Sequence, residues 1–299
     1  MTAMEGADVA VACCRRSGDA EPGDLYPDPD AGPLQAALIV LGASSSLVSW
    51  DDPRVDWASY SKVFVSSTWD SVDRPAEYLA WARRVSAVSD LNNPFAVLEW
   101  DLDKVHQRDL VAAGVPVIAT TWVAPGDHWD APPGHEFVVK PSVSAGGRNT
   151  ARYAGGDATG VAHVHALQQG GQTIMIQDYV STIDSEGETD LIFVGGEFSH
   201  AVVKKALLNT GQGILPRPWE HMSWVGLAEP SIEQLSVAER TMEAVSARLD
   251  RHPVYGRVDL VSDPSGDPLV LEVELIDPYL SLDRAPTAAT RLAMLICHY

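Results

Sequence analysis

The stretch YGRVDLVSDPSGDPLVLEVEL, residues 255–275, predicts two strands joined by a Pro-Ser-Gly-Asp turn. Side chains alternate between the two faces of a strand, so Arg257 and Asp259 share one face of the first strand. By the same alternation, Glu272 and Glu274 share one face of the second strand. The hairpin is therefore expected to bring three carboxylates together with one guanidinium.

Carboxylates that face inward among Val and Leu residues repel one another strongly unless a cation lies among them. Oxygen ligands without His or Cys suit Mg²⁺ or Mn²⁺. We therefore expect Asp259, Glu272 and Glu274 to be metal ligands. The alternative is that this face of the hairpin is simply solvated in an acidic protein.

A second cluster, FVVKPSVSAGGRNT at residues 137–150, places Lys140 at the end of an apolar strand and a Ser/Gly loop after it. A lysine in this position can reach phosphate oxygens, and the small residues Ser144, Gly146 and Gly147 let backbone N–H groups approach them. The spacing is not that of a Walker motif, and no GxGxxG occurs. Considered alone, a Gly-rich turn after a lysine is more often structural.

The chain divides into three predicted lobes that differ in secondary-structure pattern: residues 1–103, 104–180 and 181–299. The first alternates short β-rich runs with amphipathic segments, which favours an α/β lobe with a parallel sheet. A helix is expected from Asp101 or Asp103 to about Ala113, at the start of the central lobe. The last lobe combines two hairpins with a long amphipathic helix over 233–251.

Composition and charge limit the partners of the protein. Its 299 residues include 41 acidic and 21 basic ones, for a formal net charge of -20. A general nucleic-acid binder needs a Lys/Arg surface, so nucleic acid is excluded as a partner. No stretch has the ~20 apolar residues that span a bilayer, so no membrane partner is expected. The three cysteines lack metal or disulfide spacing and fit a reducing cytoplasm.

The candidate residues occur in a characteristic order along the chain. Lys104, then Lys140 with its loop, then the strand ending at residues 177–180 and an acidic hairpin with Lys204 and Lys205 precede the hairpin at 255–275. In this order the sequence resembles the ATP-grasp superfamily over essentially its whole length. The resemblance implies a mixed α/β and α+β fold, in which an N-terminal parallel-sheet lobe precedes two α+β lobes that clamp ATP.

The resemblance also implies a role for each matching position. ATP would be the co-substrate, with two Mg²⁺ or Mn²⁺ ions held by Asp259, Glu272 and Glu274. The implied catalytic residues are Arg257, Lys205 and Lys140, and the loop from Ser144 to Arg148 would close over the γ-phosphate. Lys205 stands where relatives such as bacterial glutathione synthetases carry a phosphate-facing Arg. The implied nucleotide-binding residues are Lys104, Lys140, Ser144, Gly146, Gly147, Gln177, Asp178, Tyr179, Val180, Glu188, Asp190 and Lys205.

The sequence departs from the superfamily pattern at two positions. Many ATP-grasp ligases have Asn as the last metal ligand, where this chain has Glu274. Related enzymes carry Asp-x-Arg after the hinge, where this chain has Asp190-Leu191-Ile192. The second departure removes a cation to which anchoring of a substrate carboxylate is usually assigned.

The resemblance implies an ADP-forming ligase that phosphorylates a carboxylate or ureido oxygen and lets an amine displace the phosphate. The ending EVELIDPYLSLDRAP, residues 272–286, resembles cyclo-ligases that make D-cycloserine from O-ureido-D-serine in antibiotic biosynthesis. Candidate contacts to such an amino-acid-like substrate are Arg284, Tyr279, Ser281 and the Arg15 loop. The alternatives are an amino-acid or peptide ligase of the glutathione synthetase or D-alanine–D-alanine ligase type, and a non-catalytic nucleotide-binding protein. A homodimer is the candidate assembly.

Overall fold

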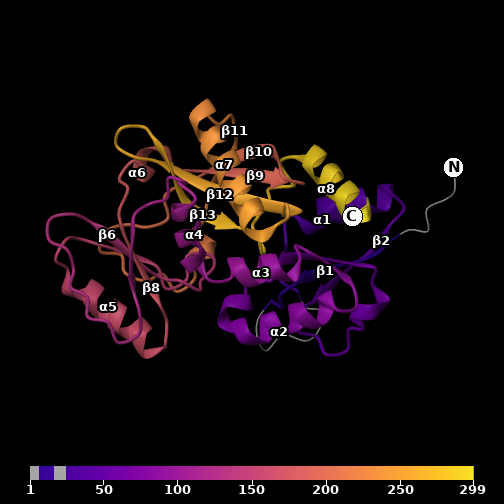
Figure 1. Ribbon diagram of the computed structural model, residues 1–299, viewed down its shortest axis with the longest axis horizontal. Helices are drawn as coiled ribbons and strands as arrows, with labels where there is room; N and C mark the ends of the chain where they lie inside the picture. The colour runs from indigo at the N-terminus through magenta and orange to yellow at the C-terminus, as the bar shows by residue number, and fades with distance from the viewer. Residues whose placement is uncertain (1–6, 17–24, 299) are drawn as a thin grey trace.

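The computed structural model describes residues 7–16 and 25–298 and contains three sheets (Figure 1). Their strands span residues 8–92, 120–178 and 188–274, so each predicted lobe holds one sheet. This mixture of a parallel sheet with two antiparallel sheets confirms the predicted fold class. The lobe boundaries at 103/104 and 180/181 stay predictions. Among the described residues, no helix is both long enough and apolar enough to cross a membrane.

The N-terminal sheet is parallel and has the strand order β2-β1-β3-β4. Its core holds Trp50, Tyr78 and Trp81, each at most 2% exposed, in edge-to-face and tilted ring contacts. The sequence pattern did not predict the second strand, because its Ser-rich sequence lacks a run of apolar residues. The elements of this lobe are β1 (Asp8–Cys13), α1 (Ala31–Val40), β2 (Ser44–Ser49), β3 (Lys62–Ser67), α2 (Pro75–Ser86), β4 (Asp90–Asn92) and α3 (Phe95–Asp101).

The helix expected from Asp101 or Asp103 to about Ala113 begins after Asp103. The α3 helix ends at Asp101, whereas a 3-10 turn at Lys104–His106 runs directly into α4 at Gln107–Ala112. The Asp103 carboxylate accepts a hydrogen bond from the Val105 N–H and so caps this segment. The Asp103 alternative is confirmed, and the side chain of Lys104 in the first turn is buried.

The central lobe is a small antiparallel sheet with the order β5-β8-β6-β7. The α5 helix covers one face of it, at the left of Figure 1. The Asp157 carboxylate caps this helix by accepting a hydrogen bond from the Thr159 N–H, so the helix begins at Ala158. The elements are β5 (Thr120–Val123), β6 (Phe137–Pro141), β7 (Ala151–Tyr153), α5 (Ala158–Gln169) and β8 (Ile174–Asp178).

The C-terminal sheet is antiparallel, with the order β11-β10-β9-β12-β13. One of its faces packs against α7, through Val237, Met242 and Val245. The alternate side chains of β9, β12 and β13 point to the other face, which carries the candidate site. The elements are α6 (Ile183–Glu186), β9 (Glu188–Val194), β10 (Glu197–Lys204), β11 (Trp224–Ala228), α7 (Ile232–Leu249), β12 (Tyr255–Ser262) and β13 (Pro268–Glu274).

The last helix of the chain packs against both its own sheet and the N-terminal lobe. The α8 helix (Pro286–His298) packs beside α1, as Figure 1 shows in yellow and indigo. Leu292 and Ile296 of α8 share one core with Leu34 and Leu38 of α1. The first and last lobes are therefore held together by a common hydrophobic core.

A buried asparagine also joins these two lobes. Asn93 is fully buried, and its amide donates to the carbonyl oxygens of Tyr255 (2.9 Å) and Leu275 (2.7 Å). Its side-chain oxygen accepts from the Val254 N–H at 2.6 Å. Asn93 is thus a cross-lobe contact rather than only the turn punctuation that its sequence neighbour Pro94 suggests.

We expect Asn93→Ala to lower the free energy of unfolding by about 3 kcal/mol, because it leaves three buried backbone groups without partners. Urea denaturation followed by tryptophan fluorescence measures this loss. Asn209→Ala is the control, since Asn209 is exposed and hydrogen-bonds only Gln212 among the described side chains. A loss at Asn93 no larger than at Asn209 would contradict the assignment.

Candidate functional site

One cavity of about 870 Å³ is lined by residues of all three lobes. Its volume is within the range of clefts that bind small molecules. The N-terminal lobe contributes Trp69, Asp70, Tyr26 and, from the Arg15 loop, Arg15 itself. Residues 17–24 of that loop lie outside the described residues. The predicted site residues in the lining are Lys104, Lys140, Ser144, Gly146, Gly147, Gln177, Asp178, Tyr179, Val180, Glu188, Arg257, Glu272 and Glu274.

The hairpin of β12 and β13 brings the three carboxylates and Arg257 together, and a β-bulge between Asp259 and Leu260 sets their register. Arg257 lies opposite Glu274, and Asp259 lies opposite Glu272. Arg257 Nε and Nη2 donate to the two carboxylate oxygens of Asp259 at 2.7 and 2.9 Å. Nη2 is also 2.9 Å from Glu274 Oε1. One guanidinium therefore neutralises part of the charge of two carboxylates, a geometry for which arginine is suited.

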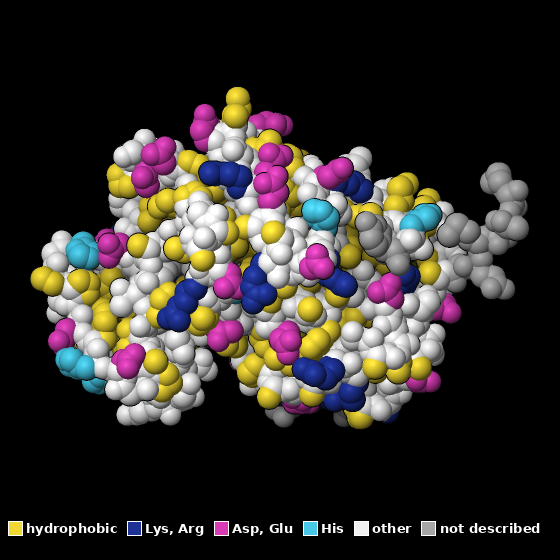
Figure 2. Space-filling view, in the orientation of Figure 1, with side chains coloured by type: hydrophobic (Ala, Val, Ile, Leu, Met, Phe, Trp, Pro, Cys, Tyr) yellow, Lys and Arg dark blue, Asp and Glu magenta, His cyan; other side chains and the backbone are white. Residues whose placement is uncertain are grey.

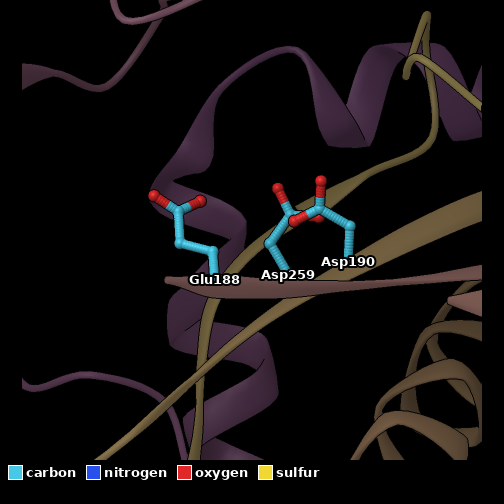
Figure 3. A group of neighbouring side chains, drawn as sticks. All are labelled: Glu188, Asp190 and Asp259. Carbon is cyan, nitrogen blue, oxygen red and sulfur yellow. The ribbon is translucent and has the colours of Figure 1, made fainter. Parts of the chain in front are cut away.

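The carboxylates form two groups that share Asp259. Asp259, Glu272 and Glu274 each offer an oxygen atom, and these atoms lie within 4.8 Å of one another. Glu188, Asp190 and Asp259 form a second group by the same measure. Figure 3 shows the side chains of Asp190 and Asp259 next to each other, with Glu188 farther along the same face of the sheet. Groups of this composition suit hard divalent cations.

Charge and burial give these carboxylates different protonation. Burial by itself raises the pKa of Glu272, but the Lys104 and Lys140 ammonium groups hold it at about 2. Burial and the neighbouring Glu272 and Asp259 raise the pKa of Glu274 to about 8, against the effect of Arg257. Burial and Asp259 likewise raise the pKa of Asp190 to about 7. At neutral pH the cluster thus holds some of its acids in the neutral form.

The second carboxylate group lies around a buried lysine, Lys204. Its Nζ is 2.6 Å from Glu188 Oε2 and 3.8 Å from Asp259 Oδ2. Asp190 does not line the cavity and is completely buried beneath these side chains. Its Oδ1 lies 3.9 Å from Lys204 Nζ and accepts no hydrogen bond from any group that the structure describes. A buried oxygen without a hydrogen bond has room for one more positive partner.

The family resemblance implied that Lys205 faces the phosphates. In the structure Lys205 does not line the cavity, and Lys204 lines it instead. Lys205 is exposed, and its backbone N–H donates to the Ser223 carbonyl. The reason is a β-bulge in β10 between Phe198 and His200. The extra residue places Lys204 opposite Glu188 and so exchanges which lysine faces the site.

Lys104 and Lys140 both reach the cavity but differ in their partners. Lys104 Nζ is 2.9 Å from Glu272 Oε1 and also donates to the Ser144 carbonyl. Lys140 is 7% exposed, and no carboxylate among the described residues lies within 4.0 Å of its ammonium group. Burial and the nearby Lys104 charge lower its pKa, against the effect of Glu272. Lys140 is therefore a buried cation that no ion pair neutralises.

The Ser/Gly loop after Lys140 is folded against the polypeptide at 207–219. Gly146 and Gly147 have positive φ angles of 60° and 72°. A Cβ atom on Gly147 would lie 2.9 Å from Leu207 and 3.2 Å from Pro218, so a side chain does not fit there. Arg148 stacks on the Trp219 ring at 4.6 Å and donates to the Trp69 carbonyl. The loop thus connects the central lobe to the other two.

We expect a bound nucleotide to change how accessible the Ser/Gly loop after Lys140 is to a protease. We expect trypsin to cut after Arg148 more slowly when ATP and Mg²⁺ are present, because a loop that closes over phosphates is protected from proteolysis. Mass spectrometry of a digestion time course measures the rate at this bond. Cleavage after Arg251, which is exposed and outside the cavity lining, provides the reference. Equal rates at Arg148 with and without nucleotide would rule out a closing loop.

The segment from Gln177 to Val180 lies where the central lobe joins the C-terminal one. The Gln177 side chain is buried and donates to Thr120 Oγ1 at 2.9 Å, while the Tyr179 N–H donates to the Glu136 carbonyl. The Asp178 carboxylate is largely exposed and pairs with His135 at 2.9 Å. The segment is held at a fixed position on the cavity wall, and its adenine-binding role stays a prediction.

Some cavity residues were absent from the sequence-based set. Asp277 lines the cavity three residues after Glu274, and Trp69, Trp219 and Trp224 also line it. The Asp-Pro dipeptide after Glu272-Val-Glu274 is the signal that could have indicated Asp277. Of the candidate substrate contacts, Tyr279 and Arg15 line the cavity. Arg284 and Ser281 do not: Ser281 is fully buried and Arg284 lies 4.0 Å from Asp283.

Comparisons with known proteins agree with this arrangement. The chain matches the crystal structure of D-cycloserine synthetase DcsG with a TM-score of 0.85 and 34% identity, over 97% of this chain and 98% of that one. The RimK domain ATP-grasp protein of Sphaerobacter thermophilus matches at TM-score 0.64 and 16% identity, over 97% and 99%. D-alanine–D-alanine ligase of Bacillus anthracis matches at 0.65 and 12%, over 97% and 96%.

The fold is therefore that of the ATP-grasp ligases. At the sequence level, the family model of the D-cycloserine synthetase DcsG N-terminal domain matches residues 9–93. The cycloserine biosynthesis protein DcsG of Streptomyces lavendulae is 37% identical over 281 residues, which is 89% of this chain and 92% of that protein. The chain belongs to the D-cycloserine synthetase (DcsG) family of ATP-grasp enzymes. The predicted superfamily and enzyme class are confirmed.

Proposed function

We propose that this protein closes O-ureido-D-serine to D-cycloserine with conversion of ATP to ADP. One observation carries the proposal: in a member of this family, buried or half-buried cations and two carboxylate groups line or adjoin a single cavity. These cations include Lys104, Lys140, Lys204 and Arg257. Phosphoryl transfer needs mainly positioning and charge stabilisation, and this set of residues supplies both.

The donor set fits Mg²⁺ or Mn²⁺. Asp259, Glu272 and Glu274 would hold a cation directly, and Glu188 with Asp190 forms the second group that the two-ion expectation requires. All five offer hard oxygen ligands, and among them the buried Oδ1 of Asp190 accepts no hydrogen bond from the described residues. Bound Mg²⁺ supplies charge neutralisation for the triphosphate. The side-chain assignments of the site are part of this proposal.

The structure of the product shows which oxygen of the substrate is phosphorylated. The ring nitrogen of cycloserine is bonded to oxygen, so it derives from the ureido nitrogen next to oxygen and not from the α-amine. That nitrogen attacks the carboxyl carbon after the carboxylate oxygen has accepted the γ-phosphoryl group, and inorganic phosphate leaves. Water then releases the carbamoyl group as carbon dioxide and ammonia. Of the two oxygens expected, the carboxylate oxygen is therefore the one phosphorylated.

Product analysis tests the proposal. The purified protein is incubated with ATP, Mg²⁺ and O-ureido-D-serine, and we expect equimolar ADP, phosphate and D-cycloserine by mass spectrometry. ADP formed only when two separate amino acids are present would favour a peptide ligase. Nucleotide binding without any ADP would favour a non-catalytic protein. The free cysteines fit a reducing, cytoplasmic location, and light scattering decides between a monomer and the expected homodimer.

A further inference from the structure

The loop that follows the last predicted metal ligand is fixed at both ends by buried carboxylates. Asp101 Oδ2 accepts from the N–H groups of Leu275 (2.7 Å) and Ile276 (3.1 Å). Asp30 accepts from the N–H groups of Leu280 (2.6 Å) and Leu282 (2.7 Å) through its two oxygens. Both carboxylates come from the N-terminal lobe. The backbone between residues 276 and 280 therefore has a defined position relative to the metal-binding hairpin.

Asp277 lies in the middle of this fixed loop. Its backbone carbonyl accepts from Trp69 Nε1 at 3.0 Å, and its Oδ2 accepts from Thr68 Oγ1 at 2.9 Å. Its side chain lines the cavity. No Lys, Arg or His nitrogen within the described chain lies within 4.0 Å of its carboxylate, whereas Asp70 on the same wall pairs with Arg74 at 2.6 Å. Asp277 is thus a cavity carboxylate without a cationic partner.

The surroundings of Asp277 favour an organic cation as that partner. Trp69, Trp224 and Tyr279 give this end of the cavity an aromatic wall, and the Trp224 and Tyr279 rings are in contact at 4.8 Å. Burial raises the pKa of Asp277 to about 7, and the nearby Asp70 charge adds to this effect. A cation bound beside it would restore the charged carboxylate.

The substrate of the proposed reaction contains such a cation next to its reacting carboxylate. Its reacting carboxylate belongs beside Arg257 and the lysines, and its α-ammonium is attached to the adjacent carbon. Arg257 Nη1 donates to the Tyr279 carbonyl at 3.3 Å, so the arginine and the Asp277 loop are in direct contact. We propose that the Asp277 carboxylate binds the α-ammonium group of the amino-acid substrate. This inference rests on the proposed function and adds a specificity-determining residue to it.

Isothermal titration calorimetry of Asp277→Asn tests the inference without turnover. O-ureido-D-serine is titrated into protein that is saturated with a non-hydrolysable ATP analogue and Mg²⁺. We expect the Kd to rise about 10- to 100-fold, as for loss of a charge-assisted hydrogen bond. Asparagine keeps the shape and can still accept from Thr68, so the fold is preserved. Asp267→Asn, at an exposed position in the turn between β12 and β13 outside the cavity lining, is the matched control, for which we expect a change below about threefold.

A substrate analogue without the α-amine separates recognition from structure. The desamino compound, 3-(ureidooxy)propanoate, should bind wild type and Asp277→Asn with equal Kd, and the ATP analogue should bind both equally. An equal loss of affinity for substrate and desamino compound would overturn the inference, as would an unchanged Kd for O-ureido-D-serine. If wild type binds O-ureido-D-serine without forming D-cycloserine, the proposed function fails while Asp277 is judged from the binding data. If wild type does not bind O-ureido-D-serine, both fail.

Discussion

Glu272→Gln should lower kcat by about 10²- to 10³-fold at millimolar Mg²⁺ in a protein that still folds, with a lower thermal unfolding midpoint because buried Lys104 loses its ion-pair partner. Glu272 belongs to the group with Asp259 and Glu274, and it also pairs with Lys104 at 2.9 Å. The substitution keeps the size of the side chain and removes its negative charge, so the hairpin can still form. A metal site depends on the charge of its ligands, and this loss acts directly on metal affinity.

The Mg²⁺ dependence of this variant distinguishes metal binding from other roles. We expect excess Mg²⁺ to restore part of the activity, because a weakened site still fills at a high concentration of the ion. Glu243→Gln, at an exposed position of α7, is the control for removal of one acidic charge. Full activity of Glu272→Gln at low Mg²⁺ would remove Glu272 from the metal site.

The hairpin could be predicted from sequence because its pattern is local. Period-two alternation places Arg257 and Asp259 on one face of β12, and Glu272 and Glu274 on one face of β13, whatever the rest of the fold does. The exact pairing of the two strands was not predictable in this way, because a β-bulge between Asp259 and Leu260 sets it. The parallel sheet of the first lobe was predictable for a similar reason, since its strands and helices alternate along the chain.

Residues whose placement depends on distant parts of the chain could not be predicted in this way. A regular hairpin across Gly195-Gly196 would put Val203 opposite Glu188, so that Lys205 would share the site face. The bulge between Phe198 and His200 shifts the register by one residue and brings Lys204 there instead. No local signal marks that bulge. Likewise, the role of Asp277 depends on Thr68, 209 residues away in the chain.

The 3-10 turn at the start of the helix after Asp103 has a comparable origin. Helical spacing predicts the helix but not the geometry of this turn, in which the Lys104 N–H donates to the Ser142 carbonyl and its ammonium group pairs with Glu272. These tertiary contacts outweigh the modest free-energy preference for a regular α-helical turn.

Lys140→Met should weaken ATP binding about 30- to 100-fold and yet leave the protein at least as stable as wild type. Lys140 is buried, and no carboxylate among the described residues lies within 4.0 Å of its ammonium group, so the more distant Glu272 offsets only part of the free-energy cost of burying its charge. Methionine has a similar length and removes that cost. The charge is needed only when a polyanion enters the cavity. The substitution is therefore expected to lower the affinity for ATP without lowering the free energy of unfolding.

Two measurements on the same variant test this reasoning. Calorimetric titration with an ATP analogue and Mg²⁺ gives the affinity, and urea denaturation gives the free energy of unfolding, which we expect to be equal to wild type or higher by about 1 kcal/mol. Lys62→Met is the control, because Lys62 pairs with Asp90 at 2.6 Å outside the cavity and should not affect nucleotide affinity. Unchanged affinity in Lys140→Met would exclude Lys140 from the phosphate site, and a large loss of stability would show that its ammonium group has a structural partner in the nucleotide-free protein.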